Sequence, residues 1–146
     1  MTPERVGLAR AGKKVGVFDH VDLPVSDVEA ATRFYRIVLK PLGYRQTSAD
    51  PPEFGALSFA HSPAPKQLHL AFIAESQGAV DLFHAVGVEA GYLSNGEPGL
   101  RAYAADYYAA YLLDPDGHNV EAVYRSAETR SRWAWLGAGV VSAAND

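Results

Sequence analysis

The sequence predicts an α+β fold made of two similar halves. A strand followed by a helix occurs at residues 18–44 and again from residue 67. Aligning His20 with His69 sets an offset of 49 residues (69 − 20 = 49), and the same offset aligns Phe34 with Phe83. Identity between the halves is low, but both strands alternate and both lead into a serine-led amphipathic helix. Two βα units that each open with a histidine predict two similar halves facing one another.

Composition restricts the class of protein. At 146 residues and 48% hydrophobic, the chain is long enough for the core of a single domain. It has 13 basic and 17 acidic residues, a net charge of −4 and no run of like charge, which argues against a nucleic-acid partner. Without cysteines, histidine and carboxylate side chains are the only strong metal ligands. No signal peptide or membrane-spanning apolar run is evident, so we expect a cytoplasmic protein with no membrane partner.

The first half begins with a polar segment and one strand. Residues 1–14 carry no strong periodicity, and we expect them to form a loose N-terminal arm. A strand is predicted at about 15–24, with His20 on its more polar face. Ser26 and Glu29 have the spacing of a capping box, which predicts the start of a helix.

The first helix is expected to finish near Pro41 and Gly43. Proline in the last turn removes a donor and ends the helix early, and glycine suits the C-cap. A short strand is predicted at 44–48. The ADPPE segment at 49–53 favours a fixed bend over sheet pairing, and a strand follows at 55–61. This half is therefore short of strand residues.

The second half repeats the strand and helix. A strand is predicted at 67–74, with His69 on its less hydrophobic face. Ser76 is the expected N-cap of the next helix, and Gly87 should weaken that helix near its end. Residues 95–99, NGEPG, are typical of a turn.

A hairpin closes the second half. Strands are predicted at 106–113 and 119–125, and the intervening residues Asp-Pro-Asp-Gly suit a tight turn. The tail at 126–146 is rich in apolar residues towards its end. We expect it to pack on the body or on a second subunit through residues that include Trp133 and Trp135.

Three residues are candidates for a metal site: His20, His69 and Glu121. Each is predicted on a strand face away from the helices, so the three would converge if the concave faces of the two halves meet. Two imidazoles and one carboxylate suit a catalytic divalent metal, because they leave positions for water and substrate. The same set serves Zn²⁺ hydrolysis and non-haem Fe(II) oxygen chemistry. The alternative is that the histidines are hydrogen-bonded interior residues and the glutamate faces solvent.

Three segments carry a resemblance to a known family. FDHVDLPVSDVEAATRFY with LGY, then QLHLAF, then YYAAYLLDPDGHNVEAVYR are similar to the glyoxalase/bleomycin-resistance/dioxygenase proteins, the vicinal oxygen chelate superfamily. The resemblance covers about residues 17–125. It implies paired βαβββ modules that form a cup-shaped β-sheet with the helices outside. A shortened first module would span 15–66 and the second 67–125, within one domain.

The resemblance also implies site residues and assembly. His20, His69 and Glu121 match three of the family's metal-ligand positions, and family members usually form homodimers. The cup is then formed within one chain or across the dimer. The fourth ligand position lies on the last strand of the first module, where no glutamate or glutamine stands at an obvious place. The nearby options are Glu53, Ser58 and His61.

The activity implied by the resemblance depends on a divalent metal, which would be Fe, Ni, Zn or Mn. Its small-molecule substrate would bind the metal through two adjacent oxygens. A lyase or isomerase needs a base, for which Glu121 is the candidate catalytic residue. An extradiol-type dioxygenase needs Fe(II) and room for dioxygen. The alternative is a metal-free, bleomycin-resistance-like protein that binds a small molecule or drug. A thiol transferase acting on an epoxide antibiotic ranks below both.

Further polar residues are weaker candidates. His118 is expected to point away from Glu121 and to be structural. Asp22 shares a strand face with His20 and is either an outer neighbour of the metal or a solvated residue at the rim. The remaining residues are candidates for orienting an anionic or aromatic substrate, although the tyrosines also suit ordinary strands: Arg101, Tyr103, Tyr107, Tyr108 and His61.

Overall fold

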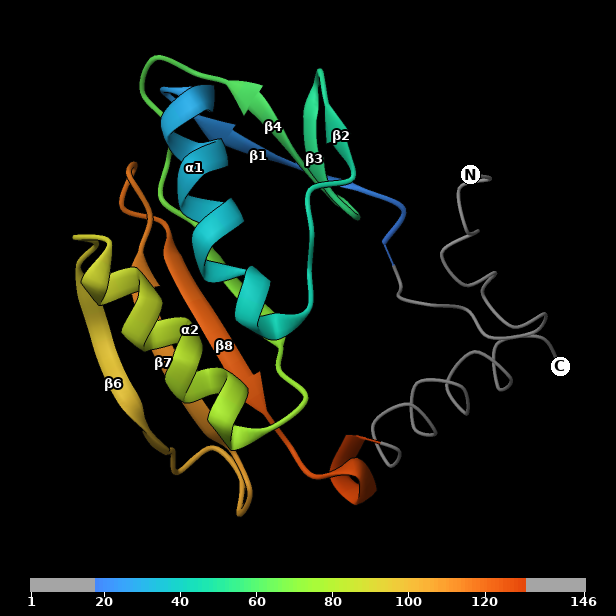
Figure 1. Ribbon diagram of the computed structural model, residues 1–146, viewed down its shortest axis with the longest axis vertical. Coiled ribbons are helices and arrows are strands. Elements are labelled where there is room, and N and C mark those ends of the chain that lie inside the picture. The colour runs from blue at the N-terminus through green and yellow to red at the C-terminus, as the bar shows by residue number, and fades with distance from the viewer. Residues whose placement is uncertain (1–17, 131–146) are drawn as a thin grey trace, which may run out of the picture.

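Two βαβββ modules form the fold in the computed structural model, which describes residues 18–130 (Figure 1). The first module contains β1 (Val21–Val25), α1 (Val28–Val38), the 3₁₀ turn η1 (Lys40–Leu42), β2 (Ser48–Ala49), β3 (Pro52–Phe54) and β4 (Leu57–His61). The second contains β5 (His69–Ile73), α2 (Gln77–Glu89), β6 (Ser94–Leu100), β7 (Tyr108–Leu113) and β8 (Asn119–Tyr124). The predicted α+β class is confirmed. The predicted arm and most of the tail, with Trp133 and Trp135, lie outside the described residues.

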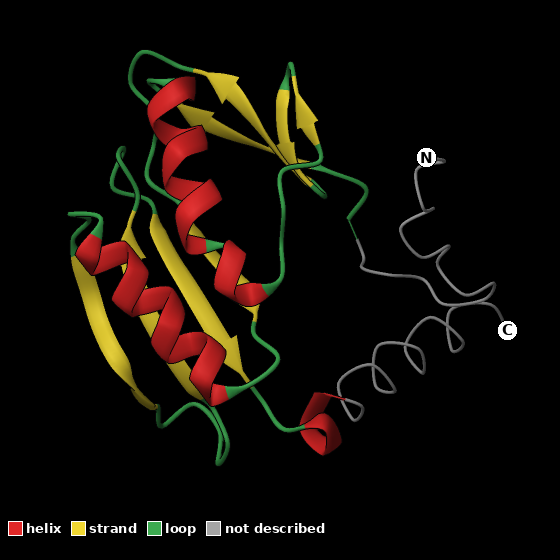
Figure 2. Cartoon of the chain, in the orientation of Figure 1, coloured by secondary structure: helices red, strands yellow, loops and turns green. Residues whose placement is uncertain are grey.

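Each module builds its own four-stranded sheet. The strand orders are β1-β4-β3-β2 and β5-β8-β7-β6, and in both sheets the first strand pairs in parallel with the last. Within residues 18–130 no strand pairing joins the two sheets, so they do not form one continuous cup within the chain. Figure 2 shows α2 lying over the strands of its own module, whereas α1 begins beside the first sheet and runs on toward α2. Neither of these helices is long and apolar enough to cross a membrane.

The two helices begin in the same way, which supports the internal repeat. Asp27 Oδ1 accepts a hydrogen bond from the backbone N–H of Ala30, and Ser76 Oγ accepts one from that of Ala79, both at 3.0 Å. These N-caps are also 49 residues apart (76 − 27 = 49). The prediction of Ser26 as the cap was wrong by one residue, because Ser26 instead donates its backbone N–H and its hydroxyl to a more distant carboxylate.

Edge strands account for the other differences from the sequence predictions. The predicted strand at 44–48 is reduced to β2, and Pro52, expected in a bend, begins β3 and pairs with Ala49. The NGEPG segment lies within β6, at the edge of the second sheet, where the register shifts on both sides of Gly96. An edge strand tolerates the missing donor of Pro98, and a shift in register accommodates the glycines.

The buried core joins both modules. Aromatic rings meet between the helices, with the Phe34 and Tyr92 ring centroids 4.7 Å apart. Where α2 packs on the second sheet, a Cβ added to Gly87 of α2 would lie 2.4 Å from Leu112 Cδ1 on β7. Glycine therefore allows α2 to approach β7 closely. The core side chains come from both sheets and both helices and include Leu23, Val25, Phe34, Tyr35, Val38, Val80, Phe83, Leu112 and Val120.

The turn between β7 and β8 ties the second module to the first. The buried hydroxyl of Tyr35 on α1 donates to Asp114 Oδ2 at 2.8 Å. His118 Nδ1 accepts from the Leu68 backbone N–H at 2.9 Å, and its Nε2 donates to the Pro24 carbonyl oxygen at 2.8 Å. Because His118 is fully buried and both ring nitrogens are engaged in this way, its role is structural.

Candidate functional site

His69 and Glu121 meet on the face of the second sheet that lies away from α2. In the parallel β5–β8 ladder Ala71 is opposite Glu121, so His69 lies diagonally across from the glutamate. His69 Nε2 is 2.9 Å from Glu121 Oε2. Alternation puts neighbouring residues such as Val120 into the core under α2 and leaves this pair on the opposite face. The local strand pattern therefore predicts the side on which the pair is found.

The carboxylate of Glu121 is enclosed although it lies on the open face. Its side chain is only 2% exposed, whereas that of His69 is half exposed. The Tyr107 hydroxyl donates a hydrogen bond to Glu121 Oε1. Burial and this hydrogen bond raise the pKa of Tyr107 well above its ordinary value. The Arg125 guanidinium lies 4.7 Å from the centre of the Tyr107 ring. Both carboxylate oxygens of Glu121 therefore have defined partners.

Two asparagines orient the His69 ring. Asn95 Nδ2 donates to Asn119 Oδ1 at 3.0 Å, and Asn119 Nδ2 lies 2.8 Å from His69 Nδ1. With the Asn119 amide in this orientation, Nδ1 accepts and Nε2 carries the proton that is donated to Glu121. A metal ligand must present a lone pair, so a cation at Nε2 would take the place of this proton.

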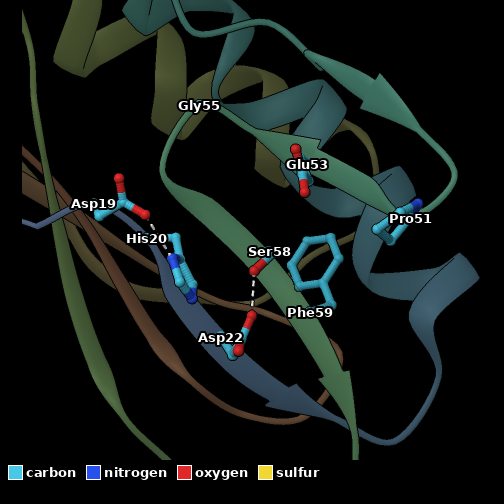
Figure 3. A pocket seen from close by; sticks show the side chains of 8 residues that line it. All are labelled: Asp19, His20, Asp22, Pro51, Glu53, Gly55, Ser58 and Phe59. Atoms are coloured by element: carbon cyan, nitrogen blue, oxygen red, sulfur yellow. Dashed lines mark hydrogen bonds and ion pairs between the residues drawn. The ribbon is translucent and has the colours of Figure 1, made fainter.

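His20 lies apart from this pair, on the first sheet. It immediately precedes β1 and lines a hollow of about 420 Å³ with Asp22, Glu53 and Ser58 (Figure 3). Its Nδ1 is 2.9 Å from Asp19 Oδ2, and this hydrogen bond, with the charge of Asp22, raises the pKa of His20. Within residues 18–130 no three histidine or carboxylate side chains are placed to hold a metal. The three predicted ligands do not converge in one chain, because each sheet carries its own part of the set.

The candidate substrate residues divide between two faces. Tyr107 contacts Glu121, and the 75% exposed Tyr103 packs edge-on against Tyr107, with ring centroids 5.2 Å apart. Tyr108 lies on the other face, where its hydroxyl donates to Asp81 on α2. His61 ends β4 on the face opposite Ser58 and is absent from the hollow lining. Only part of the predicted set therefore lies beside the His69–Glu121 pair.

The sequence interpretation missed Tyr111. This residue is directly opposite Glu121 in the β7–β8 ladder, and its ring centroid is 6.3 Å from that of His69. The Arg101 guanidinium lies 5.3 Å from the centre of the Tyr111 ring, so Arg101 also borders this face. Strand alternation could have identified Tyr111, because continuing it from Tyr107 into β7 places residues 107, 109 and 111 on one face.

The donor chemistry at His69 and Glu121 fits a divalent metal. Imidazole nitrogen and carboxylate oxygen are common ligands of Zn²⁺ and of the first-row transition metals. The two donor atoms are 2.9 Å apart, so a cation that displaces the shared proton could contact both. His20 supplies a donor of the same class on the other sheet.

Known proteins share the fold of this chain. The family model of the Glyoxalase/Bleomycin resistance protein/Dioxygenase superfamily matches residues 17–122. A glyoxalase/bleomycin resistance protein from Albidiferax ferrireducens is 31% identical, with 76% of this chain and 100% of that chain covered and a TM-score of 0.60. A glyoxalase/bleomycin resistance protein/dioxygenase family enzyme from Burkholderia phytofirmans is 20% identical, with coverage of 73% and 96% and a TM-score of 0.58. An oxidase is 23% identical, with coverage of 77% and 96% and a TM-score of 0.58. A comparison with curated proteins found no match.

Proposed function

Because this chain belongs to the glyoxalase/bleomycin resistance protein/dioxygenase superfamily, we propose that it is a divalent-metal-dependent enzyme acting on a small molecule with two adjacent oxygen atoms. The observation that carries the proposal is the His69–Glu121 pair on the open face of the second sheet. The cost of burying Glu121 is offset by its contacts with His69 and Tyr107, and a cation that replaced the His69 proton would keep the carboxylate paired. Glu121 is buried beside a half-exposed imidazole, so the pair is accessible to a ligand from one side.

The residues around the pair have separate tasks in this proposal. A bound divalent cation would supply stabilisation of negative charge on the two substrate oxygens. Glu121 is the group that we assign to proton transfer, because a carboxylate next to the substrate can accept a proton. Tyr107 fixes the orientation of that carboxylate through Oε1. Arg101 and Tyr111 border the same face and would contact the substrate.

A second copy of the chain would supply the third donor. His20 lies on the first sheet, which does not share a strand with the second, so it does not reach the His69–Glu121 pair in its own chain. Ile73, on the same face as that pair, is 53% exposed, and a partner would cover it. In a two-fold dimer, His20 of each copy would face the His69–Glu121 pair of the other, which gives two identical sites.

The first test is metal content. Protein purified anaerobically without chelators should hold about one metal per chain, as a site in a two-fold dimer requires, and His69→Ala should lose it. His84→Ala is the matched control, because His84 is on α2 and contacts Ser94. Iron would assign the dioxygenase branch, and nickel, zinc or manganese the lyase or isomerase branch. If no tested ion binds after reconstitution, the metal-enzyme proposal is wrong.

A mixed dimer tests whether two copies share the site. In a dimer of one His20→Ala chain and one Glu121→Ala chain, a shared arrangement gives one intact site and one doubly altered site. Both homodimers should then lack metal, while the mixed dimer should bind one ion. If each site belonged to a single chain, neither site of the mixed dimer would be intact. Absence of metal from the mixed dimer would therefore refute the shared site.

A metal-free binding protein is the second candidate function. Ala71 and Ile73 follow His69 on the same strand face and give that face apolar character. In this case the His69–Glu121 pair would serve as a hydrogen-bonding site for a small molecule or drug. Tight binding of a small molecule by the metal-free protein, unchanged by chelators, would support this function over the enzyme.

A further inference from the structure

The internal repeat identifies which residues correspond in the two sheets. The N-caps of α1 and α2 and the two histidines share the offset of 49 residues. The same offset aligns Asp22 with Ala71 (71 − 22 = 49). Both residues lie two positions after the histidine, on the same strand face as that histidine.

Strand register extends the correspondence to the last strand of each module. Ala71 on β5 is opposite Glu121 on β8, and Asp22 on β1 is opposite Ser58 on β4; both pairings are parallel. Ser58 is therefore the counterpart of Glu121. In the second module the small residue is on the first strand and the carboxylate on the last. In the first module the carboxylate and the small residue have exchanged strands.

The carboxylate of Asp22 lies beside Ser58, the position on β4 that corresponds to Glu121 on β8. Ser58 Oγ donates a hydrogen bond to Asp22 Oδ1, so the two side chains meet across the β1–β4 pair (Figure 3). Asp22 lines the same hollow as His20. Asp19 engages His20 Nδ1, which leaves Nε2 as the free ring nitrogen. A carboxylate on one imidazole nitrogen is the usual partner of a histidine that binds metal through the other.

We propose that Asp22 is the fourth protein ligand of the metal, in place of a carboxylate on β4. This inference rests on the proposed function, because His20 and Asp22 of one copy would join His69 and Glu121 of the other. A fourth protein donor would leave fewer positions on the metal for exogenous ligands, whereas an extradiol-type dioxygenase needs room for dioxygen as well as for its substrate. Asp22 therefore favours the lyase or isomerase branch.

The position of the carboxylate, on β1 instead of β4, can be reversed by mutation. Asp22→Ala should weaken binding of Zn²⁺ or Co²⁺ at least about 10-fold, since even the outer partners of metal ligands contribute 10–100-fold. Adding Ser58→Glu to Asp22→Ala recreates the Ala71–Glu121 arrangement and should restore most of the lost affinity. Affinity and stoichiometry are measured by calorimetry on the full-length protein. Thermal unfolding of each variant checks that the protein is folded.

A second carboxylate in the same hollow provides the comparison. Glu53 lines it opposite Ser58 and is the alternative fourth ligand, so Glu53→Gln should leave affinity close to that of the wild type if Asp22 is the ligand. A loss of affinity in Glu53→Gln with none in Asp22→Ala would assign the ligand to Glu53 and overturn the proposal for Asp22. If Asp22→Ala binds metal as tightly as the wild type while His69→Ala does not, the assignment of Asp22 is overturned and the proposed function stands. If Ser58→Glu fails to restore metal affinity to a folded Asp22→Ala protein, the inference that Asp22 replaces a carboxylate at position 58 is overturned. If the wild type binds no metal, both proposals are overturned.

Discussion

Replacing Tyr35 with phenylalanine tests the contact that ties the two modules together. The Tyr35 hydroxyl donates to Asp114 Oδ2, and both residues are buried. Phenylalanine keeps the ring and its edge contact with Phe34, at a centroid distance of 4.9 Å. Asp114 Oδ1 keeps its hydrogen bonds from the backbone N–H groups of Asp116 and His118. The substitution therefore removes one hydrogen bond to one carboxylate oxygen and little else.

The expected cost follows from that single loss. A hydrogen bond to a charged group contributes about 1.5–3 kcal/mol, so Tyr35→Phe should lower the free energy of unfolding by about 2 kcal/mol. For a chain of this size, that loss corresponds to a fall in Tm of roughly 4–8 °C. Urea unfolding should show a lower midpoint with an unchanged m value. Tyr103→Phe, at an exposed position, is the control and should change stability by less than about 0.5 kcal/mol.

The pH dependence gives a second check of the same contact. Burial raises the pKa of Asp114, while the hydrogen bond from Tyr35 opposes that rise. Tyr35→Phe should raise the folded-state pKa further. A raised folded-state pKa means that the folded protein takes up a proton more readily as pH falls, so the variant regains stability relative to the wild type in acid. A loss below about 0.5 kcal/mol at neutral pH, or one that grows in acid, would refute the reasoning.

Two other substitutions test local packing and charge. Gly87→Ala gains about 1 kcal/mol of helix propensity, but its Cβ would clash with Leu112, which is packed in the core. Overpacking costs about 1–3 kcal/mol, so urea unfolding should show a net loss, and a stabilised variant would contradict the close approach of α2. Hydrogen bonds from Thr129 and Ser126 lower the pKa of Asp106 to about 2, below its ordinary 3.8. The resulting stabilisation is present above pH 3.8 and is lost as pH falls towards 2. Asp106→Asn should therefore lose less stability over that interval than the wild type, and parallel stability curves would count against this contact.

Local signals in the sequence were sufficient for the repeated framework. The spacing of apolar residues, the proline and glycine after the first helix and the turn between β7 and β8 act over a few residues, and the structure contains the corresponding elements. Strand alternation also placed His69 and Glu121 on the face away from α2, where they meet. The N-cap was displaced from Ser26 to Asp27, because both residues are good caps and a distant acceptor engages Ser26.

Contacts between segments far apart in the chain were decided only by the tertiary structure. No local pattern predicted that NGEPG would lie in β6, because proline and glycine enter an edge strand only when a neighbouring strand pairs with it. Alternation identifies the face of a strand but not which faces come together. It therefore did not reveal that Tyr111 lies opposite Glu121, or that His20 and the His69–Glu121 pair belong to separate sheets. The correspondence of Asp22 with Ala71, and of Ser58 with Glu121, required the register of both parallel pairs. Local propensity determines the elements along the chain, whereas pairing between distant strands determines which side chains share a site.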